Sequence, residues 1–286
     1  MNVLVLGVSG MLGSAVFRYL SANSPHRVTG TVRSRAADKF FSRAEQDCLL
    51  AGVDVLDPDA LAAAFAKAKP DVVINCVGLI KQLADAKDPL TALPINAMLP
   101  HRLATLCKVA GARLIHISTD CVFSGSKGMY TESDESDCTD LYGKSKFIGE
   151  LHHLDHAVTL RTSIIGHELQ SSASLIDWFL SQEGSTRGFT KAIFSGLPTA
   201  ELARVILDYV IPNPSLKGLY HVSAEPIDKY TLLELVARIY GKSIEISPDA
   251  KLVIDRSLDS TRFRTTTGYQ PPAWPALIEF MHAQRV

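Results

Sequence analysis

Several reactive side chains follow one another at the end of an apolar stretch of the chain. The segment IHISTDC, residues 115–121, places hydroxyl, carboxylate and thiol groups directly after an apolar run. Polar groups at the end of a buried parallel strand lie at the carboxyl edge of the sheet, where ligands bind. Thr119 can donate a hydrogen bond to a carbonyl oxygen there, and Cys121, two residues later, points to the same side if the strand geometry continues. We expect this segment to form one edge of an active site.

A second pair of reactive side chains has the spacing of one helical turn. Tyr142 and Lys146 are four residues apart in LYGKSK, so they share one face of a helix. A phenol has an ordinary pKa of about 10 and relays protons poorly at neutral pH unless a cation favours the phenolate. Lys146 supplies that cation, and Tyr142 can then protonate a carbonyl oxygen during hydride delivery. Together with Thr119, the pair predicts a carbonyl reductase.

The N-terminal segment carries a glycine pattern typical of dinucleotide-binding turns. The pattern G-x-x-G-x-x-G in VLVLGVSGMLG lies between an apolar run and a helical pattern. Such glycines let backbone N–H groups approach a pyrophosphate at the positive end of the helix. The cofactor contacts expected in this turn are Gly7, Ser9, Gly10, Met11, Leu12 and Gly13.

The residues after the second predicted strand favour NADPH as the cofactor. An acid at this position would bind the ribose 2′-hydroxyl of NADH, whereas arginine accommodates a 2′-phosphate. The segment TGTVRSRA contains Arg33 and Arg35 and no acid, so NADPH is expected and NADH is left open. Further cofactor contacts are expected at the ends of the third and fourth strands, at Asp54, Val55, Cys76, Val77 and Gly78.

Apolar runs that alternate with helical patterns must position these residues. Strands are expected at 2–6, 27–32, 49–53, 71–76, 113–118 and 158–162, and helices at 11–23, 58–69, 89–110 and 142–152. Continuous apolar strands are typical of a parallel sheet that is covered on both faces. The pattern predicts an α/β fold with a doubly wound, Rossmann-like parallel sheet.

The regular alternation of predicted strands and helices ends near residue 165. Loops rich in Gly, Ser and Pro then separate short elements at 175–182, 199–210, 218–222, 231–240 and 276–282. We predict an NAD(P)-binding domain over residues 1–165 and a smaller substrate-binding domain over 166–286. This second domain is expected to pack against the first and to return some segments to it.

Composition excludes several classes of protein. The chain has 286 residues and a net charge of -1, so it lacks the basic excess of a nucleic-acid binder. Its five cysteines include no C-x-x-C pair, which argues against disulfides or a zinc ribbon. His152 and His156 have zinc-ligand spacing but no third ligand in frame, so no metal site is expected. No signal peptide or membrane span is predicted, which favours the cytoplasm.

Together these motifs resemble the extended short-chain dehydrogenases/reductases. GVSGMLG, HISTDCVFSG, YGKSK, LRTSIIG and DRSLDSTRF…TGYQPPAW are more narrowly similar to dTDP-4-dehydrorhamnose reductases and related nucleotide-sugar reductases, over nearly the whole chain. The resemblance implies NADPH-dependent reduction of a nucleotide-linked 4-keto-6-deoxy sugar, for cell-surface polysaccharide precursors. It places Thr119, Tyr142 and Lys146 on catalytic positions. Asn96 is similar to a family asparagine that helps to order the site. We therefore expect Asn96 to contact the cofactor as well.

The chain departs from the family pattern in two places. Those reductases usually continue the strand as STDYVF, with tyrosine where this chain has Cys121, and they follow the fourth strand with an alanine-rich stretch. Here the sequence reads NCVGLIKQ, which makes Lys81 and Gln82 candidates for the sugar pocket. Stacking and phosphate pairing suggest further substrate contacts in the second domain. These candidates are His167, Trp178, Arg256 and Arg262.

Cys121 keeps an alternative activity open. In GDP-fucose synthases, a neighbouring branch, a cysteine in a similar strand end acts as acid/base in epimerisation. Alignment on Phe123 puts Cys121 on that position, with His167 as a candidate partner acid. The T-D-E pattern of nucleotide-sugar dehydratases is absent, so dehydration is excluded. Some relatives are non-catalytic regulatory subunits, which is a further alternative, and a homodimer is left open.

Overall fold

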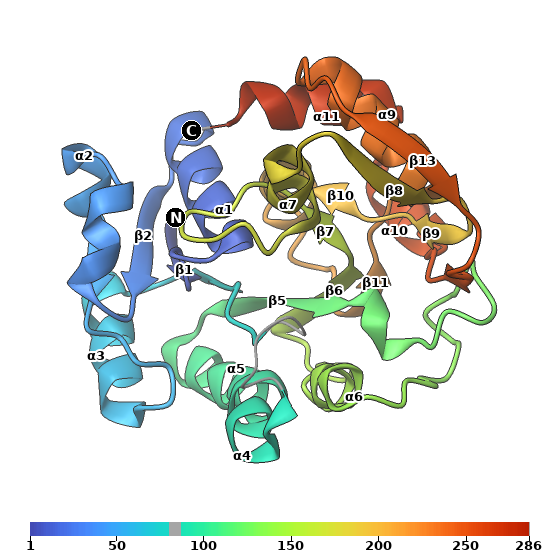
Figure 1. Cartoon of the computed structure of the whole chain (residues 1–286). Coiled ribbons are helices and arrows are strands. Elements are labelled where there is room, and N and C mark those ends of the chain that lie inside the picture. The colour runs from blue at the N-terminus through green and yellow to red at the C-terminus, as the bar shows by residue number, and fades with distance from the viewer. Residues whose placement is uncertain (80–86, 286) are drawn as a thin grey trace.

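A seven-stranded parallel sheet is the centre of the computed structural model, which describes residues 1–79 and 87–285 (Figure 1). The strand order is β11-β6-β5-β4-β1-β2-β3, and each pair of neighbours is parallel. This order confirms the predicted doubly wound, Rossmann-like fold. The strands are β1 (Asn2–Leu6), β2 (Arg27–Val32), β3 (Leu49–Ala51), β4 (Val72–Asn75), β5 (Arg113–Thr119), β6 (Ala157–Thr162) and β11 (Gly218–His221).

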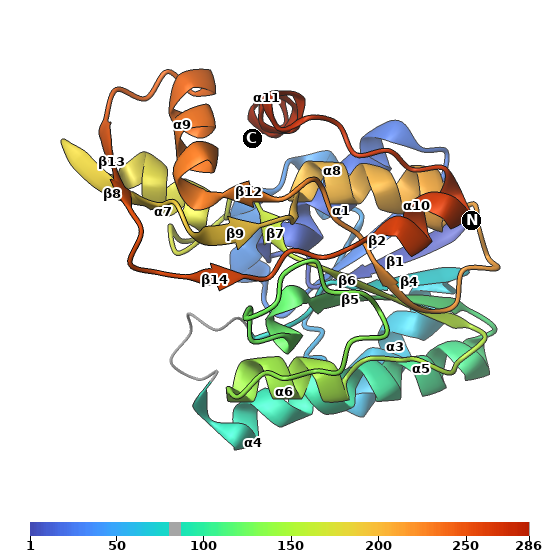
Figure 2. The same cartoon turned by 90° about the vertical axis from the view of Figure 1, so that its right-hand side faces the viewer.

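Helices cover both faces of this sheet (Figure 2). Successive residues of β1 point to opposite faces, so Val5 joins the core beneath one helical layer and Leu4 the core beneath the other. The layers contain α1 (Met11–Asn23), α8 (Thr199–Val205), α10 (Thr261–Thr267) and α11 (Trp274–Ala283) on one side, and α3 (Pro58–Ala68), α4 (Pro89–Ala92), α5 (Leu99–Ala110) and α6 (Leu141–Ile148) on the other.

Two helical segments differ from the prediction. Residues 89–110 are helical throughout, but the π-helical turn η3 (Leu93–Met98) separates α4 from α5. The helix predicted over 142–152 ends earlier, at Ile148. Gly149 follows it, and a Cβ there would lie 2.1 Å from the carbonyl oxygen of Asn96. This close approach packs the end of α6 against η3.

The C-terminal part adds small sheets that the sequence pattern did not predict. Strand order is β12-β9-β14 in one of them, and β7–β10 and β8–β13 form two pairs. Strand β11 returns to the main sheet beside β6. The division into domains near residue 165 stays a prediction. The remaining elements are η1 (Arg35–Phe40), α2 (Arg43–Gln46), η4 (Asp120–Val122), β7 (Ile164–Ile165), α7 (Leu175–Ser181), β8 (Ser185–Phe189), β9 (Ala192–Phe194), β10 (Leu197–Pro198), η5 (Ile206–Val210), β12 (Ile227–Asp228), α9 (Lys229–Ile239), β13 (Glu245–Asp249) and β14 (Ile254–Asp255).

Candidate active site

The glycine turn between β1 and α1 has the backbone geometry that its sequence requires. Gly7 has a φ of 81°, which favours glycine, and its carbonyl oxygen accepts a 3.0 Å hydrogen bond from the amide of Gly10. A Cβ on Gly13 would lie 2.1 Å from that oxygen, so the turn closes tightly. Gly10 is exposed and precedes an α1 N-terminus without a side-chain cap. The turn therefore leaves backbone amides for an anion.

The other residues of this turn differ in what they can offer a ligand. Ser9 and Met11 are partly exposed, whereas the side chain of Leu12 is buried in the core. A cofactor can therefore contact Leu12 only through its backbone.

The ends of β2 and β3 carry the residues predicted to bind the adenosine half of the cofactor. Arg33 follows β2 and is exposed, and within the described part of the chain it forms no ion pair. Arg35 instead lies 3.5 Å from Asp38. After β3, the carboxylate of Asp54 accepts a 2.9 Å hydrogen bond from the amide of Leu56. Val55 follows it and packs against the core.

The end of β4 meets the helix that carries Lys146. Gly78 is exposed, and a Cβ there would lie 3.9 Å from the Nζ atom of Lys146 and 3.6 Å from the Oδ1 atom of Asn96. Asn96 Oδ1 accepts from the amide of Leu79 at 2.9 Å, and its Nδ2 donates to the Oγ atom of Ser145 at 3.2 Å. Asn96 thus joins the segment after β4 to α6.

Two further predicted cofactor contacts, Cys76 and Val77, lie beside Gly78. Both are half-buried, and burial raises the pKa of the Cys76 thiol to about 12 although Lys146 opposes this shift. The amide of Val77 donates to Asn75 Oδ1 at 3.1 Å. The predicted sugar contacts Lys81 and Gln82 lie outside the described residues.

Thr119 and Tyr142 meet at the carboxyl end of β5. Thr119 is 7% exposed; its hydroxyl accepts from the amide of Cys121 at 3.1 Å and donates to the carboxylate of Asp120 at 3.2 Å. Burial raises the pKa of the Tyr142 phenol, the nearby Cys121 raises it further, and the Thr119 hydroxyl opposes the shift. Thr119 and Tyr142 therefore lie beside each other, but the pKa of Tyr142 is raised, contrary to the shift that the sequence predicted from Lys146.

Lys146 lies one turn further along the same face of α6. It is 6% exposed, and its ammonium donates a 2.7 Å hydrogen bond to the carbonyl oxygen of Ile117 on β5. Burial lowers the pKa of Lys146 to about 8, and the charges of Glu150 and Cys76 oppose the shift. The ammonium is therefore mostly charged at pH 7 and loses its proton when the pH rises through about 8.

Cys121 contacts a cation from the C-terminal part of the chain. Its Sγ atom lies 3.6 Å from Nη1 of Arg256, whose Nε donates to the carbonyl oxygen of Phe123 at 2.8 Å. Burial and the charge of Asp120 raise the pKa of the thiol to about 12, and the charge of Arg256 opposes this shift. In this arrangement the thiol is protonated at neutral pH. Of the predicted substrate residues in the C-terminal part, Arg256 is the one that these contacts bring to Cys121.

The other predicted substrate residues have contacts elsewhere. His167 bonds Asp177 through Nδ1 at 2.6 Å and the Tyr240 hydroxyl through Nε2 at 2.9 Å. Trp178 is 38% exposed on α7, and the guanidinium of Arg262 lies 4.6 Å from the ring centre of Tyr220. No described contact joins these three residues to Thr119 or Tyr142, so their roles stay predictions.

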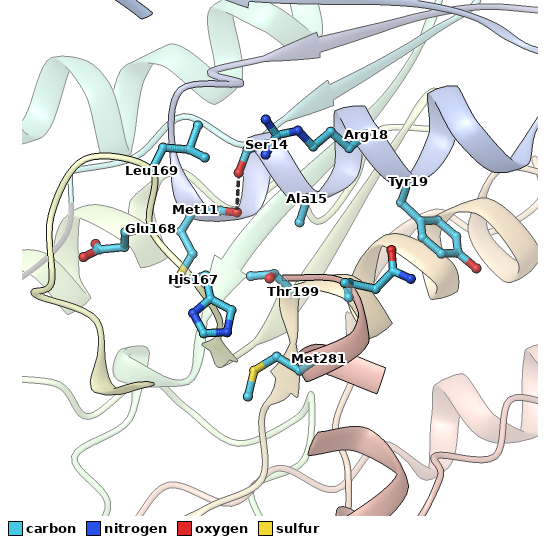
Figure 3. A pocket seen from close by; sticks show the side chains of 12 residues that line it. Met11, Ser14, Ala15, Arg18, Tyr19, His167, Glu168, Leu169, Thr199 and Met281 are labelled. Carbon is cyan, nitrogen blue, oxygen red and sulfur yellow. Dashed lines mark hydrogen bonds between the residues drawn. The ribbon is translucent and has the colours of Figure 1, made fainter. Parts of the chain in front are cut away.

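A cavity of about 100 Å³ lies between α1 and the loop that carries His167 (Figure 3). Met11 and Ser14 line one wall, and Thr199 and Met281 line the other. The hydroxyl of Ser14 is already bonded to the carbonyl oxygen of Met11 at 3.1 Å. The cavity therefore lies beside the first turns of α1.

Lys229 is a cation near Asp120 and Cys121 that sequence reasoning missed. It begins α9 directly after Asp228, which pairs with Ile193 on β9; Ile193 in turn pairs with Asp255, the residue before Arg256. Burial lowers the pKa of Lys229, while Asp120 and Cys121 oppose the shift. The small sheet thus brings Lys229 and Arg256 to one place, and only the strand pairing reveals this.

The histidines with zinc-ligand spacing have other partners. His152 Nε2 lies 3.1 Å from the carboxylate of Glu150, and His156 Nε2 lies 2.9 Å from the carbonyl oxygen of Ala104. Within residues 1–79 and 87–285, no group of three or more His, Cys, Asp or Glu side chains could hold a metal ion. No helix in the same ranges is long and apolar enough to cross a membrane.

Known proteins similar to this chain include both reductases and a subunit of another enzyme. The family model "RmlD substrate binding domain" matches residues 1–284. The methionine adenosyltransferase 2 subunit beta of Danio rerio is 31% identical over 253 residues, which cover 84% of this chain and 74% of that protein. A solved structure of a hypothetical dTDP-4-dehydrorhamnose reductase from Sulfolobus tokodaii is 26% identical, with a TM-score of 0.76 and coverage of 96% of this chain and 98% of that one.

A further structure supports the fold alone. The dTDP-4-dehydrorhamnose reductase of Bacillus anthracis in complex with NADP has a TM-score of 0.80 at 20% identity, and the match covers 99% of this chain and 98% of that one.

Proposed function

Because the chain belongs to the RmlD substrate binding domain family, we propose that it is an NADPH-dependent reductase of the 4-keto group of a nucleotide-linked 4-keto-6-deoxy sugar. The observation that carries this proposal is the contact between Tyr142 and Thr119 at the end of β5, with Lys146 bonded to Ile117 on the same strand. The product would serve as a precursor of cell-surface polysaccharide, made in the cytoplasm.

The residues present fit a nicotinamide cofactor. The uncapped N-terminus of α1 and the exposed Gly10 leave room and backbone amides for a pyrophosphate. Gly78 has no side chain to separate a ligand from Lys146 and Asn96. Arg33, exposed and without an ion pair among the described residues, is suited to a 2′-phosphate, and the Bacillus anthracis structure contains NADP.

The reaction needs one hydride and one proton. When bound, a reduced nicotinamide would be the source of the hydride for the carbonyl carbon. Tyr142 supplies the proton from its hydroxyl to the carbonyl oxygen, because its raised pKa keeps the phenol protonated before the reaction. Thr119 donates a second hydrogen bond to that oxygen, for which its hydroxyl must turn away from Asp120. Lys146 stabilises the phenolate that remains and holds the cofactor ribose.

A regulatory role is the second candidate, and the curated relative favours it. The Danio rerio protein is described as a subunit of methionine adenosyltransferase, and it matches most of this chain. A subunit of that kind would bind a nucleotide in the same turn and contact a catalytic partner without reducing a sugar.

The deciding experiment incubates the purified protein with NADPH and a panel of 4-keto-6-deoxy nucleotide sugars. Oxidation of NADPH with one of these sugars, lost in Tyr142→Phe, supports the reductase. NADPH binding without turnover of any sugar, together with an altered rate of a methionine adenosyltransferase catalytic subunit, supports the regulatory role instead.

A further inference from the structure

Glu150 joins three parts of the structure through one buried carboxylate. It lies two residues after the end of α6 and is 5% exposed. Its Oε1 atom accepts from the Ser118 hydroxyl at 2.7 Å and from Nε of Arg161 at 2.9 Å. Its Oε2 atom accepts from Nη2 of Arg161 at 2.6 Å and lies 3.1 Å from His152 Nε2. The carboxylate therefore ties the end of α6 to β5 and β6.

The attachment to β5 lies directly beside the catalytic hydroxyl. Lys146 bonds the carbonyl oxygen of Ile117, and Glu150 bonds the side chain of Ser118, which is the residue before Thr119. Helix α6 is thus fastened to β5 at two consecutive residues. Gly149 fixes the same helix end against Asn96, because its missing side chain allows the close approach to that carbonyl oxygen.

Glu150 also supplies the negative charge around Lys146. Within the described ranges, the titratable groups outside α6 that interact electrostatically with this ammonium are Cys76, directly after β4, His116 on β5, and Glu150. Burial keeps the Cys76 thiol protonated, and burial together with Lys146 holds the pKa of His116 well below its usual value, so His116 is neutral. Burial also opposes ionisation of Glu150, but hydrogen bonds from His152, Arg161 and Ser118 outweigh it and hold the pKa at about 2.

We propose that Glu150 is a positioning residue, which fixes the Tyr142–Lys146 face of α6 relative to Thr119 and supplies the buried anion that Lys146 faces. The inference rests on the proposed function, because it assigns Glu150 to the same site. Glu150 itself does not touch the reacting atoms: it acts through Lys146 and through Ser118.

The chain offers a matched control in Glu201. That carboxylate is 1% exposed and is likewise bonded by one arginine and one hydroxyl. Arg204 donates from Nε at 2.9 Å and from Nη2 at 2.7 Å, and Tyr269 donates at 2.8 Å. Glu201 lies on α8, in the other helical layer. Glu201→Gln therefore removes a comparable buried charge without touching α6.

The test measures NADPH affinity by fluorescence titration, and kcat where a sugar is turned over, from pH 6.5 to 9.5 in the wild type, Glu150→Gln and Glu201→Gln. Loss of the anion should shift the alkaline decline of NADPH affinity to lower pH by about one unit in Glu150→Gln alone. The same variant should lose about tenfold in kcat at pH 7 while KM changes little. Both glutamine variants should lose thermal stability, because Glu150→Gln leaves the buried Arg161, and Glu201→Gln the partly buried Arg204, without its anionic partner.

If Glu150→Gln shifts the alkaline limb no more than Glu201→Gln does, Glu150 is only structural and the proposal is wrong. Should Glu150→Gln fail to fold, Glu150→Gln with Arg161→Met removes both charges and carries the same test. The NADPH titration needs no sugar, so an absence of sugar reduction would contradict the proposed function and leave the assignment of Glu150 to be judged by its own result.

Discussion

The Nζ atom of Lys146 donates a 2.7 Å hydrogen bond to the carbonyl oxygen of Ile117. Ile117 lies two residues before Thr119 on β5. The bond therefore joins α6, which carries Tyr142, to the strand that carries Thr119. Burial lowers the pKa of Lys146 to about 8, so folding buries a charge at neutral pH. The buried ammonium therefore destabilises the fold, and a lysine with so strongly lowered a pKa is typical of a functional site.

Replacing Lys146 should separate activity from stability. Lys146→Met removes the cation that stabilises the Tyr142 phenolate, and we expect kcat to fall by about 100-fold or more. The unfolding temperature should stay the same or rise at pH 7, because the variant no longer buries an ammonium. Lys144→Met, an exposed residue of the same helix, is the control and should keep its kcat. Equal activity in the two variants would contradict the role of Lys146.

Two glycines of the N-terminal turn should respond differently to alanine. Gly13→Ala places a Cβ 2.1 Å from the carbonyl oxygen of Gly7, and the overlap should cost about 1–3 kcal/mol of stability. Gly10 has a φ of −87° and only a 3.4 Å contact to the same oxygen, so Gly10→Ala should fold normally. Its methyl group should weaken NADPH binding by about tenfold, because it lies where the pyrophosphate approaches. Thermal unfolding and fluorescence titration check the pair, and a Gly10→Ala variant with unchanged affinity would argue against the turn as the cofactor site.

The sheet could be predicted from the sequence because its strands are buried on both faces. Such strands are continuous apolar runs, and the predicted ranges of β1 and β2 agree with the structure residue for residue. The family was also predicted correctly from the motifs, as the match over residues 1–284 shows. Thr119 ends β5 and Tyr142 lies in the first turn of helix α6, so the motifs placed both near the carboxyl edge of the sheet before the structure was known.

The contribution of the C-terminal part could not be predicted in the same way. Strands β12 and β14 have two residues each and no periodic pattern, and tertiary packing alone decides how they pair. That pairing brings Lys229 to Cys121 and Arg256. Helix α6 ends early for a similar reason, since the contact between Gly149 and Asn96 joins residues far apart in the sequence.

Arg33 should set the preference for NADPH. A charged hydrogen bond to the 2′-phosphate contributes about 1.5–3 kcal/mol, so Arg33→Ala should weaken NADPH by about 10- to 100-fold relative to NADH. Arg35 is paired with Asp38, so Arg35→Ala should change the ratio less. Dissociation constants of both cofactors for both variants give the answer. The assignment fails if Arg33→Ala weakens NADH and NADPH equally.

Cys121 should be dispensable for reduction. Burial and the neighbouring Asp120 raise the pKa of its thiol to about 12, so the thiol stays protonated at neutral pH and is not available as a base. We expect Cys121→Ala to keep kcat within about tenfold. In deuterated water the wild-type product should carry no solvent deuterium at C3 or C5 of the sugar. Solvent deuterium at either carbon that disappears in Cys121→Ala would instead establish the epimerase-reductase alternative.

His221 should make stability depend on pH below neutrality. The buried ring donates from Nδ1 to the carbonyl oxygen of Tyr130 at 2.9 Å and accepts at Nε2 from Arg161 at 3.0 Å, so a second proton would break the Arg161 bond. Burial and the charge of Arg161 lower the pKa of His221 to about 4. An unfolded histidine takes up its proton near pH 6.5. The stabilisation is thus complete above pH 6.5 and is lost as the pH falls through 4.

The measurement is the unfolding temperature of wild type and His221→Gln between pH 8 and 4. Glutamine can donate and accept but does not titrate, so the wild type should fall below pH 6.5 more steeply than the variant. The difference in stability between the two should shrink by up to about 3 kcal/mol over that range. His153→Gln, an exposed histidine, should follow the wild type. Parallel curves for wild type and His221→Gln would show that another group carries the acid sensitivity.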